Sequence, residues 1–254
     1  MTIQATVEDP IAHLRGTTDD PRFKVAAARR MMFRNGLDGL LGGHVSTRAA
    51  DGESCWITPI QYFDETLPSD VIRLSLDGDL VEGDGGLSRS PGLGFHASIY
   101  RARPDVNAVI HTHAFWLAVL STMTLPFDVY HDHGSLFLDQ VVELRETTEL
   151  NAADSADEIA AALGDKGVML LRNHGSINVA DSIETATGEA IFLEWAARHQ
   201  VASVQAGGLP MNHDLARWYQ QAYRKTGAGR LTWESNLRRL RRSDPELFDS
   251  VSAA

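Results

Sequence analysis

The sequence predicts an α/β fold with a mixed or antiparallel sheet. Two runs rich in apolar and β-branched residues, 106–112 and 167–171, are typical of buried strands. Segments with helix start and stop patterns are interleaved with these and other strand-like runs, but they do not form regular strand–helix–strand units. The length of 254 residues favours one domain, which is long enough to bury a large core.

The first half of the chain is predicted to contain one helix followed by short strands. Asp20 can cap a helix that has Pro21 in its first turn, and Asn35-Gly36 supplies its end. Asp77-Gly78 is a tight-turn pair, so the runs on either side of it are expected to form a hairpin. The strand-like runs are 44–47, 54–58, 71–76 and 79–82.

The second half is predicted to be richer in helix. Pro104 ends one helix, Ser155 with Glu158 begins another through a capping box, and Asp181 caps a long one. The helices are expected at 93–103, 115–123, 155–164, from 181 to about 206, and from 215 to about 242. We expect three parts in the whole chain: a flexible arm over 1–20, one domain over 21–245, and a flexible tail over 246–254.

The composition limits the classes of function. Hydrophobic residues make up 43% and charged residues 22% of the chain, as in a globular protein. The net charge of −11 is opposite in sign to that of general nucleic-acid or anionic-membrane binders, so we expect neither partner. The chain has one cysteine, no secretory leader and no apolar run long enough to cross a bilayer. These features predict a soluble cytoplasmic protein.

Histidines gather at the ends of the two predicted buried strands. His111 and His113 are two residues apart, so both side chains point to the same face of their strand. His174 follows the second strand and reaches the same place if the two strands are neighbours. Three neutral imidazoles with an open position are typical of a catalytic metal site, although histidines at a sheet rim can also be ordinary hydrogen-bonded groups. Imidazole suits both Zn²⁺ and Fe²⁺, so the pattern does not choose the ion.

Three segments resemble the class II aldolase/adducin family. They are 96–113, which ends in His111-Thr112-His113, then Leu171-Arg172-Asn173-His174-Gly175, and Gly42-Gly43-His44-Val45-Ser46-Thr47-Arg48. The resemblance covers about residues 22–242. It implies a three-layer αβα sandwich with a central, mainly antiparallel sheet, and a homotetramer with active sites near the subunit boundaries.

The resemblance also implies roles for single residues. Family aldolases bind Zn²⁺ through the histidines that match His111, His113 and His174, and this ion polarises a carbonyl and stabilises an enediolate. A tyrosine near the position of Tyr130 donates a proton during carbon–carbon cleavage. The candidate substrate-binding positions are His44, Ser46, Thr58 and Ser90.

One position departs from the aldolase pattern in a way that bears on the chemistry. Family aldolases carry their general base, a glutamate, four residues before the histidine that matches His96, and here that position is Gly92. Glycine cannot move a proton. His131 or His133, oriented by Asp132, is a candidate catalytic replacement, because histidine is a competent base near neutral pH; the alternative is a loop that only faces water. His96 itself is expected to make a structural hydrogen bond.

These departures decide between the functions that the family contains. The phosphate-binding positions are eroded, because His44 replaces the usual asparagine and Pro91 a serine. We therefore expect a divalent-metal-dependent lyase that cleaves or decarboxylates a small carbonyl compound or 2-oxo acid, and not a sugar-phosphate aldolase. Decarboxylation needs no base to remove a carbon-bound proton, so it tolerates Gly92. The alternatives are a non-heme Fe²⁺ oxygenase that oxidatively decarboxylates a 2-oxo acid, an epimerase, and a non-catalytic adducin-like binding protein, which would be expected to lose the three histidines.

Overall fold

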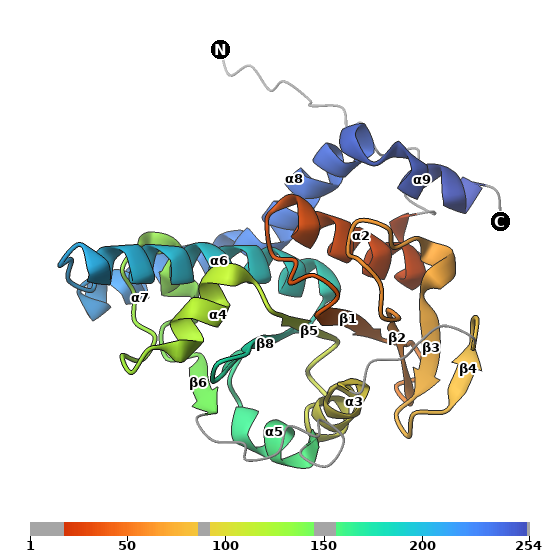
Figure 1. The fold of residues 1–254 in the computed structure, drawn as a ribbon, viewed down its shortest axis with the longest axis horizontal. Helices are drawn as coiled ribbons and strands as arrows, with labels where there is room; N and C mark the ends of the chain where they lie inside the picture. The colour runs from red at the N-terminus through yellow and green to blue at the C-terminus, as the bar shows by residue number, and fades with distance from the viewer. Residues whose placement is uncertain (1–17, 86–91, 145–155, 253–254) are drawn as a thin grey trace.

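The computed structural model describes residues 18–85, 92–144 and 156–252, and these contain one eight-stranded sheet between helices (Figure 1). The strands are β1 (Gly43–Arg48), β2 (Ser54–Ile57), β3 (Ile72–Ser75), β4 (Leu80–Glu82), β5 (Ala108–Thr112), β6 (Val141–Leu144), β7 (Val168–Leu171) and β8 (Gly175–Ala180). They are ordered β4-β3-β2-β1-β5-β8-β7-β6. Every neighbouring pair is antiparallel except β6 and β7. The predicted hairpin of β3 and β4 is confirmed.

Helices cover both faces of this sheet, which confirms the three-layer αβα arrangement. The helices are α2 (Pro21–Arg34), α3 (Leu93–Ala102), α4 (Phe115–Thr122), α5 (Ala156–Leu163), α6 (Ile183–Gln205), α7 (His213–Thr226), α8 (Ala228–Ser243) and α9 (Pro245–Ser252), with short 3-10 helices η2 (Pro68–Asp70) and η3 (Asp132–Phe137). The larger core packs α2, α4, α6 and α8 against one face, and the smaller core packs α3 and α5 against the other (Figure 1).

The alternation of side chains along β5 explains why the sheet has two cores. Ala108 and Ile110 point into the larger core, whereas Val109 points into the smaller one. Side chains two residues apart in a strand share a face. His111 is therefore directed to the side of the sheet covered by α3 and α5, and the functional site described below lies there.

Two strands, β6 and β8, are not among the predicted elements. β6 has only four residues, all half-buried, and its pattern is weak. β8 is a central strand between β5 and β7, and its Ile177 and Val179 join the smaller core while the alternating Ser176 and Asn178 are buried on the other face. Its backbone pairs with neighbours on both sides, so tertiary context decides its conformation.

The C-terminal part of the chain also differs from the expectation. The single helix expected from 215 to about 242 is two helices, α7 and α8, because Gly227 between them adopts the left-handed conformation with φ of 64°. α6 is capped by Ser182, not Asp181: the Ser182 hydroxyl accepts the backbone N–H of Thr185 at 3.2 Å. The expected flexible tail instead continues into α9, whose Leu247 and Phe248 are buried. Residues 1–17 of the expected arm, and Ser155 of the predicted capping box, lie outside the described residues.

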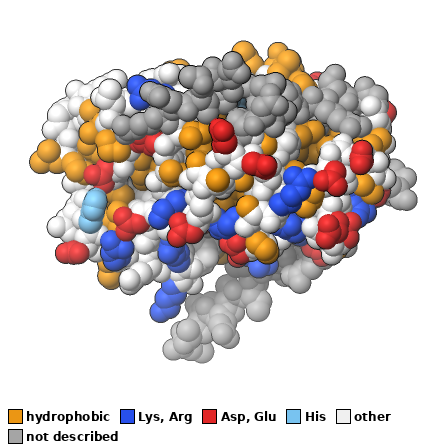
Figure 2. Space-filling model, turned by 90° about the horizontal axis from the view of Figure 1, so that it is seen from below, with side chains coloured by type: hydrophobic (Ala, Val, Ile, Leu, Met, Phe, Trp, Pro, Cys, Tyr) orange, Lys and Arg blue, Asp and Glu red, His pale blue; other side chains and the backbone are white. Residues whose placement is uncertain are grey.

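Acidic and basic side chains are interspersed over the face seen in Figure 2, and the whole chain carries a net charge of −11. Among the described helices, none combines the length and the apolar character needed to span a bilayer.

Candidate metal centre

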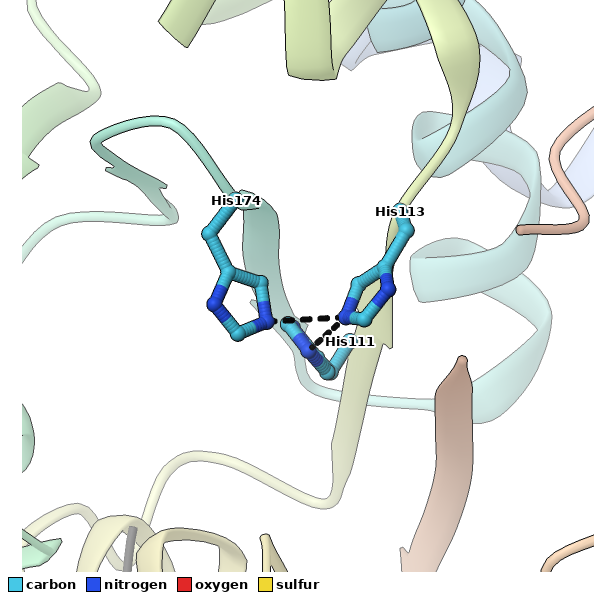
Figure 3. Close-up of side chains that lie close together, drawn as sticks. All are labelled: His111, His113 and His174. Carbon is cyan, nitrogen blue, oxygen red and sulfur yellow. Dashed lines mark hydrogen bonds between the residues drawn. The ribbon is translucent and has the colours of Figure 1, made fainter. Parts of the chain in front are cut away.

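Three imidazoles converge where β5 ends and β7 turns into β8 (Figure 3). His111 and His113 lie at and just after the end of β5, and His174 lies in the turn between β7 and β8. The Nε2 atom of His113 is 2.9 Å from that of His111 and 2.8 Å from that of His174. The structure thus brings together the three histidines that the sequence predicts as metal ligands.

The local backbone explains how His174 reaches this position. The strands β7 and β8 are joined by only three residues, since Leu171 pairs with Gly175 in the sheet. Asn173 takes a left-handed conformation with φ of 57°, which asparagine tolerates better than most residues. The backbone N–H of His174 then donates to the Leu171 carbonyl at 3.1 Å, so the turn holds the imidazole against β5.

The three rings are suited to act as neutral nitrogen ligands. The Nδ1–H of His111 donates to the Ser176 carbonyl at 2.9 Å, which leaves the lone pair of its Nε2 directed at the other two rings. Burial holds the pKa of His111 well below its usual range, and burial together with the nearby His174 lowers the pKa of His113 to about 4. Burial also lowers the pKa of His174. At neutral pH all three rings are therefore uncharged, as metal binding requires.

The donor set fits a divalent metal ion. Three imidazole nitrogens with no fourth protein ligand are a known catalytic arrangement for Zn²⁺, and the same donors also accept Fe²⁺. Two of the described groups of His, Cys, Asp and Glu are close enough to hold an ion, and only this one consists entirely of imidazoles. Imidazole nitrogens bind both Zn²⁺ and Fe²⁺, so this donor set is compatible with either ion.

A cavity of about 240 Å³ opens beside the three rings. His44 and Gly92 line it together with the triad, and its other walls are mainly apolar. No Lys, Arg, Asp or Glu belongs to the described lining, so these residues provide neither a cation for a phosphate group nor a carboxylate base. The lining residues are Leu41, Gly42, Gly43, His44, Pro59, Ile60, Gly92, Phe95, His111, His113, Ile159, Leu171 and His174.

His44 fills the space beside the position of the missing glutamate. A Cβ atom built on Gly92 would lie 2.5 Å from Nε2 of His44, which is far inside van der Waals contact. The rings of His44 and His111 are 4.9 Å apart, and those of His44 and Phe95 are 5.4 Å apart. The imidazole thus occupies the wall of the cavity that a longer side chain at residue 92 would need.

A buried hydrogen-bond chain supports His44 from behind. Nδ1 of His44 is 2.7 Å from Nε2 of His96, and Nδ1 of His96 is 2.7 Å from the Ser46 hydroxyl. Ser46 is in turn 2.7 Å from the Tyr100 hydroxyl. All four side chains are buried, and burial lowers the pKa of both histidines well below the usual range. The expectation that His96 makes a structural hydrogen bond is confirmed.

Of the three predicted substrate-binding residues that the structure describes, only His44 lines the cavity. Ser46 is fully buried and belongs to the hydrogen-bond series with His96 and Tyr100. Thr58 is 1% exposed, and its hydroxyl accepts a hydrogen bond at 2.8 Å from the guanidinium of the buried Arg29. Both hydroxyls therefore support the walls of the site in this chain. Ser90 lies outside the described residues.

The predicted catalytic residues Tyr130, His131 and His133 lie elsewhere in the chain. They belong to the segment around η3, which packs against α6 and α7, and none of them lines the cavity. The His131 ring stacks on His199 with 4.0 Å between centroids. Asp132 accepts a hydrogen bond from Tyr223 at 2.6 Å. Within one chain, the structure does not bring this cluster to the three histidines.

One supporting residue was not identified from the sequence. Glu194 of α6 is 6% exposed, and its carboxylate accepts the backbone N–H groups of Trp116 and Leu117 at 2.9 and 3.0 Å. Burial raises the pKa of this carboxyl, although the two hydrogen bonds oppose the shift. It holds the start of α4, directly after His113. In the sequence, Glu194 stands among apolar residues of a predicted helix, and a carboxylate in such a place usually has a buried partner.

Comparison with known proteins agrees with this architecture. Residues 23–201 match the family model described as the class II aldolase and adducin N-terminal domain. The L-fuculose 1-phosphate aldolase from Glaciozyma antarctica has the same fold, with a TM-score of 0.80 and 24% identity over 90% of this chain and 91% of that one.

Several relatives are named for different activities. The 4-hydroxy-3-prenylphenylpyruvate oxygenase/4-hydroxy-3-prenylbenzoate synthase of Streptomyces roseochromogenus is 32% identical, over 84% of this chain and 78% of its own length. The 3,4-dihydroxyphthalate decarboxylase of Rhodococcus jostii is 31% identical, over 77% and 82% respectively. The meiotically up-regulated gene 14 protein of Schizosaccharomyces pombe is 29% identical, and the match spans 64% of that relative, slightly less than two thirds. From the family match and this fold, the chain belongs to the class II aldolase and adducin family.

Proposed function

We propose that this chain is a divalent-metal-dependent lyase that decarboxylates a small organic acid. The substrate class is a β-oxo acid or an ortho-hydroxylated aromatic acid, in which the electron pair left by carbon dioxide can be delocalised onto an oxygen. A simple 2-oxo acid has no such electron sink and fits only the oxidative alternative described below. His111, His113 and His174 would hold the ion, either Zn²⁺ or Fe²⁺. The similarity to a relative named as a decarboxylase supports this reaction type.

The observation that carries the proposal is the chemistry of the cavity lining. It contains four histidines and no described carboxylate or cationic side chain. Aldol cleavage of a sugar phosphate needs a base and a phosphate-binding group. Loss of carbon dioxide needs neither, because the bond to the carboxylate supplies the electron pair, and a proton from solvent later completes the product.

The residues of this chain have separable tasks in such a reaction. When bound, a divalent ion supplies a Lewis acid that stabilises negative charge developing on the substrate oxygen. The apolar walls, including Phe95, Ile159 and Leu171, exclude water from the reacting acid and favour loss of its charged carboxylate. His44 lies in the cavity wall beside Gly92. The volume of about 240 Å³ fits only a small substrate.

An oxygenase on the same site is the second candidate. The relative named as an oxygenase and synthase is 32% identical over 84% of this chain. Three protein ligands leave open positions on a six-coordinate ion such as Fe²⁺ for a chelating substrate and O₂. Oxygen consumption coupled to turnover separates this candidate from the lyase.

Assembly into a homotetramer is part of the proposal. Tyr130, His131 and His133 lie away from the cavity of their own chain, so a catalytic contribution from them requires the cavity of a neighbouring subunit. Substitution of His133 that slows turnover in the tetramer without changing its metal content would support this role, and unchanged turnover would remove it.

The experiment has two parts. Protein purified without oxygen should hold about one metal ion per chain, and His111→Ala, His113→Ala and His174→Ala should each lose it while the far-ultraviolet circular dichroism spectrum stays native. His213→Ala, at an exposed histidine, is the matched control. Full metal retention in all three triad variants would show that the site assignment is wrong.

The second part measures reaction type. Carbon dioxide release is followed for a panel of the proposed acids with and without oxygen, beside cleavage of sugar phosphates. We expect oxygen-independent release and little aldol cleavage, since general-base catalysis typically contributes ~10²–10⁴-fold. Brisk cleavage of a sugar phosphate would contradict the proposal, and oxygen-dependent turnover would favour the second candidate.

A further inference from the structure

We propose that His44 presents an N–H group, not a lone pair, to the cavity, and that it donates a hydrogen bond to an anionic oxygen of the substrate. It therefore does not replace the missing base. This inference rests on the proposed function for the substrate that binds beside the three histidines. It assigns a role to His44, whose ring lies beside Gly92, the position at which family aldolases carry their catalytic glutamate.

The position of His44 leaves one ring nitrogen for the cavity. Its Nδ1 is engaged with His96 at 2.7 Å, so only Nε2 is free to meet a ligand. Nε2 is the atom that a Cβ on Gly92 would approach to 2.5 Å. The ring also lies 4.9 Å from the ring of His111, between centroids. A substrate held at the triad is thus within reach of this nitrogen.

The direction of the buried hydrogen-bond chain decides which tautomer His44 adopts. Tyr100 is 1% exposed, and Ser46 is the side-chain partner of its hydroxyl. If Tyr100 donates to Ser46, then Ser46 donates to Nδ1 of His96, and Nε2–H of His96 donates to Nδ1 of His44. Every hydrogen that links these four side chains then has an acceptor, and the ring proton of His44 is on Nε2.

The opposite direction leaves a buried hydrogen without a partner. His44 would donate to His96, His96 to Ser46, and Ser46 to Tyr100, whose own hydrogen finds no other acceptor among the printed contacts of the described residues. An unmet buried donor destabilises the folded protein, so the first direction is the stable one.

An N–H at this place has a defined chemical use. It cannot take a proton from carbon, which fits a reaction that needs no base. A neutral imidazole can instead stabilise an oxyanion by donating to it, as preorganised donors do in other active sites. The substrate should therefore carry an anionic oxygen, either its carboxylate or a developing enolate or phenolate oxygen, on the side of Gly92.

The tautomer can be measured directly on the Zn²⁺-loaded protein by nitrogen-15 NMR with labelled histidine. The spectrum of His44→Gln identifies the His44 signals by their loss. We expect a protonated Nε2 and an unprotonated Nδ1. The reverse tautomer, or a charged ring at neutral pH, would overturn the inference. If the protein binds no ion, the proposed function fails. The tautomer of His44 can then still be measured on the metal-free protein, so the two failures are distinguishable.

A binding measurement tests the donor itself, with oxalate as the probe and the metal-loaded protein as the receptor. His44→Gln keeps an N–H donor, whereas His44→Leu removes it at similar size. The hydrogen bond to a charged oxygen should make oxalate binding about tenfold weaker in His44→Leu, and His44→Gln should recover most of that loss. Equal affinity in the wild type and His44→Leu would overturn the proposal. If neither variant folds, the His44 signals are assigned in the wild-type protein through their correlations with the backbone, and the NMR measurement decides.

Discussion

The His44 ring occupies the space at the cavity wall that a side chain at residue 92 would need. A side chain added at residue 92 would therefore collide with this ring. The His44 ring cannot move away freely, because it is buried and its Nδ1 contacts His96. A carboxylate restored at residue 92 therefore displaces the imidazole before it can act as a base. The two positions are separated by 48 residues and form one functional unit.

We predict that Gly92→Ala disturbs the site even though alanine is small. The new Cβ would lie 2.5 Å from Nε2 of His44, so turnover should fall at least tenfold and the melting temperature should drop by several degrees, as overpacking by about 1–3 kcal/mol implies. Gly134→Ala is the control, since its Cβ would come no closer than 3.5 Å to any atom. Equal behaviour of the two variants in thermal melts and assays would refute the pairing.

At the scale of elements, the two ends of the described chain are joined by a buried ion cluster. Asp244 is 0% exposed and contacts Arg30 and Arg34 of α2 at 3.1 and 3.0 Å. Burial alone would raise the pKa of this carboxyl, but hydrogen bonds led by that from Arg34 lower it below its usual value. The cluster places α9 so that Phe248 packs on Phe23 with 5.2 Å between ring centroids.

We expect Asp244→Ala to lower the free energy of unfolding by about 3 kcal/mol, because it removes the buried carboxylate that pairs with Arg30 and leaves this guanidinium only the exposed Glu246. The measurement is urea unfolding at pH 7. Asp249→Ala, at an exposed position of α9, should change the free energy by no more than about 0.5 kcal/mol. A loss at Asp244 that is no larger than this control would show that the cluster is not what holds α9.

For the whole molecule, the buried histidines make stability depend on pH. The folded state keeps His44, His96 and His111 neutral, since burial holds each pKa well below 6.5, whereas the unfolded chain takes up protons below that value. Metal-free protein should therefore lose stability as the pH falls from about 6.5 toward 4. Burial raises the pKa of Glu189 to about 7, and this acts in the opposite direction, but on fewer groups.

Urea unfolding of chelator-treated protein between pH 7.5 and 4.5 measures this dependence. The free energy of unfolding should be nearly constant above about pH 6.5 and should decline below it. His96→Asn removes one of the titrating groups, so its curve should be flatter over the same range. A wild-type curve that stays level down to pH 4.5 would contradict the prediction.

We also predict that the protein is a tetramer in solution. Light scattering should report about four times the chain mass of 27.8 kDa at micromolar concentration. Leu209 in the connection between α6 and α7 is 86% exposed, and Trp218 on α7 is 61% exposed. Such large exposed apolar side chains are usual at subunit contacts. A monomer at this concentration would refute the prediction.

Local periodicity alone determined several features of this protein. The two-residue spacing of His111 and His113 places both side chains on one face of a strand, whatever surrounds it. Asp20 and Pro21 begin α2, and Asp77-Gly78 turns β3 into β4, because caps and tight turns depend on neighbouring residues. The family resemblance added the three-layer fold.

Contacts between distant segments were decided only by the tertiary structure. The order of the sheet puts the turn with His174 beside β5, and it also buries Ser176 and Asn178, the polar residues of β8. The same order brings His44 against Gly92 and lines up His96, Ser46 and Tyr100 behind it. Sequence patterns report each residue's neighbours along the chain, whereas the chemistry of this site depends on neighbours across the sheet, which packing selects.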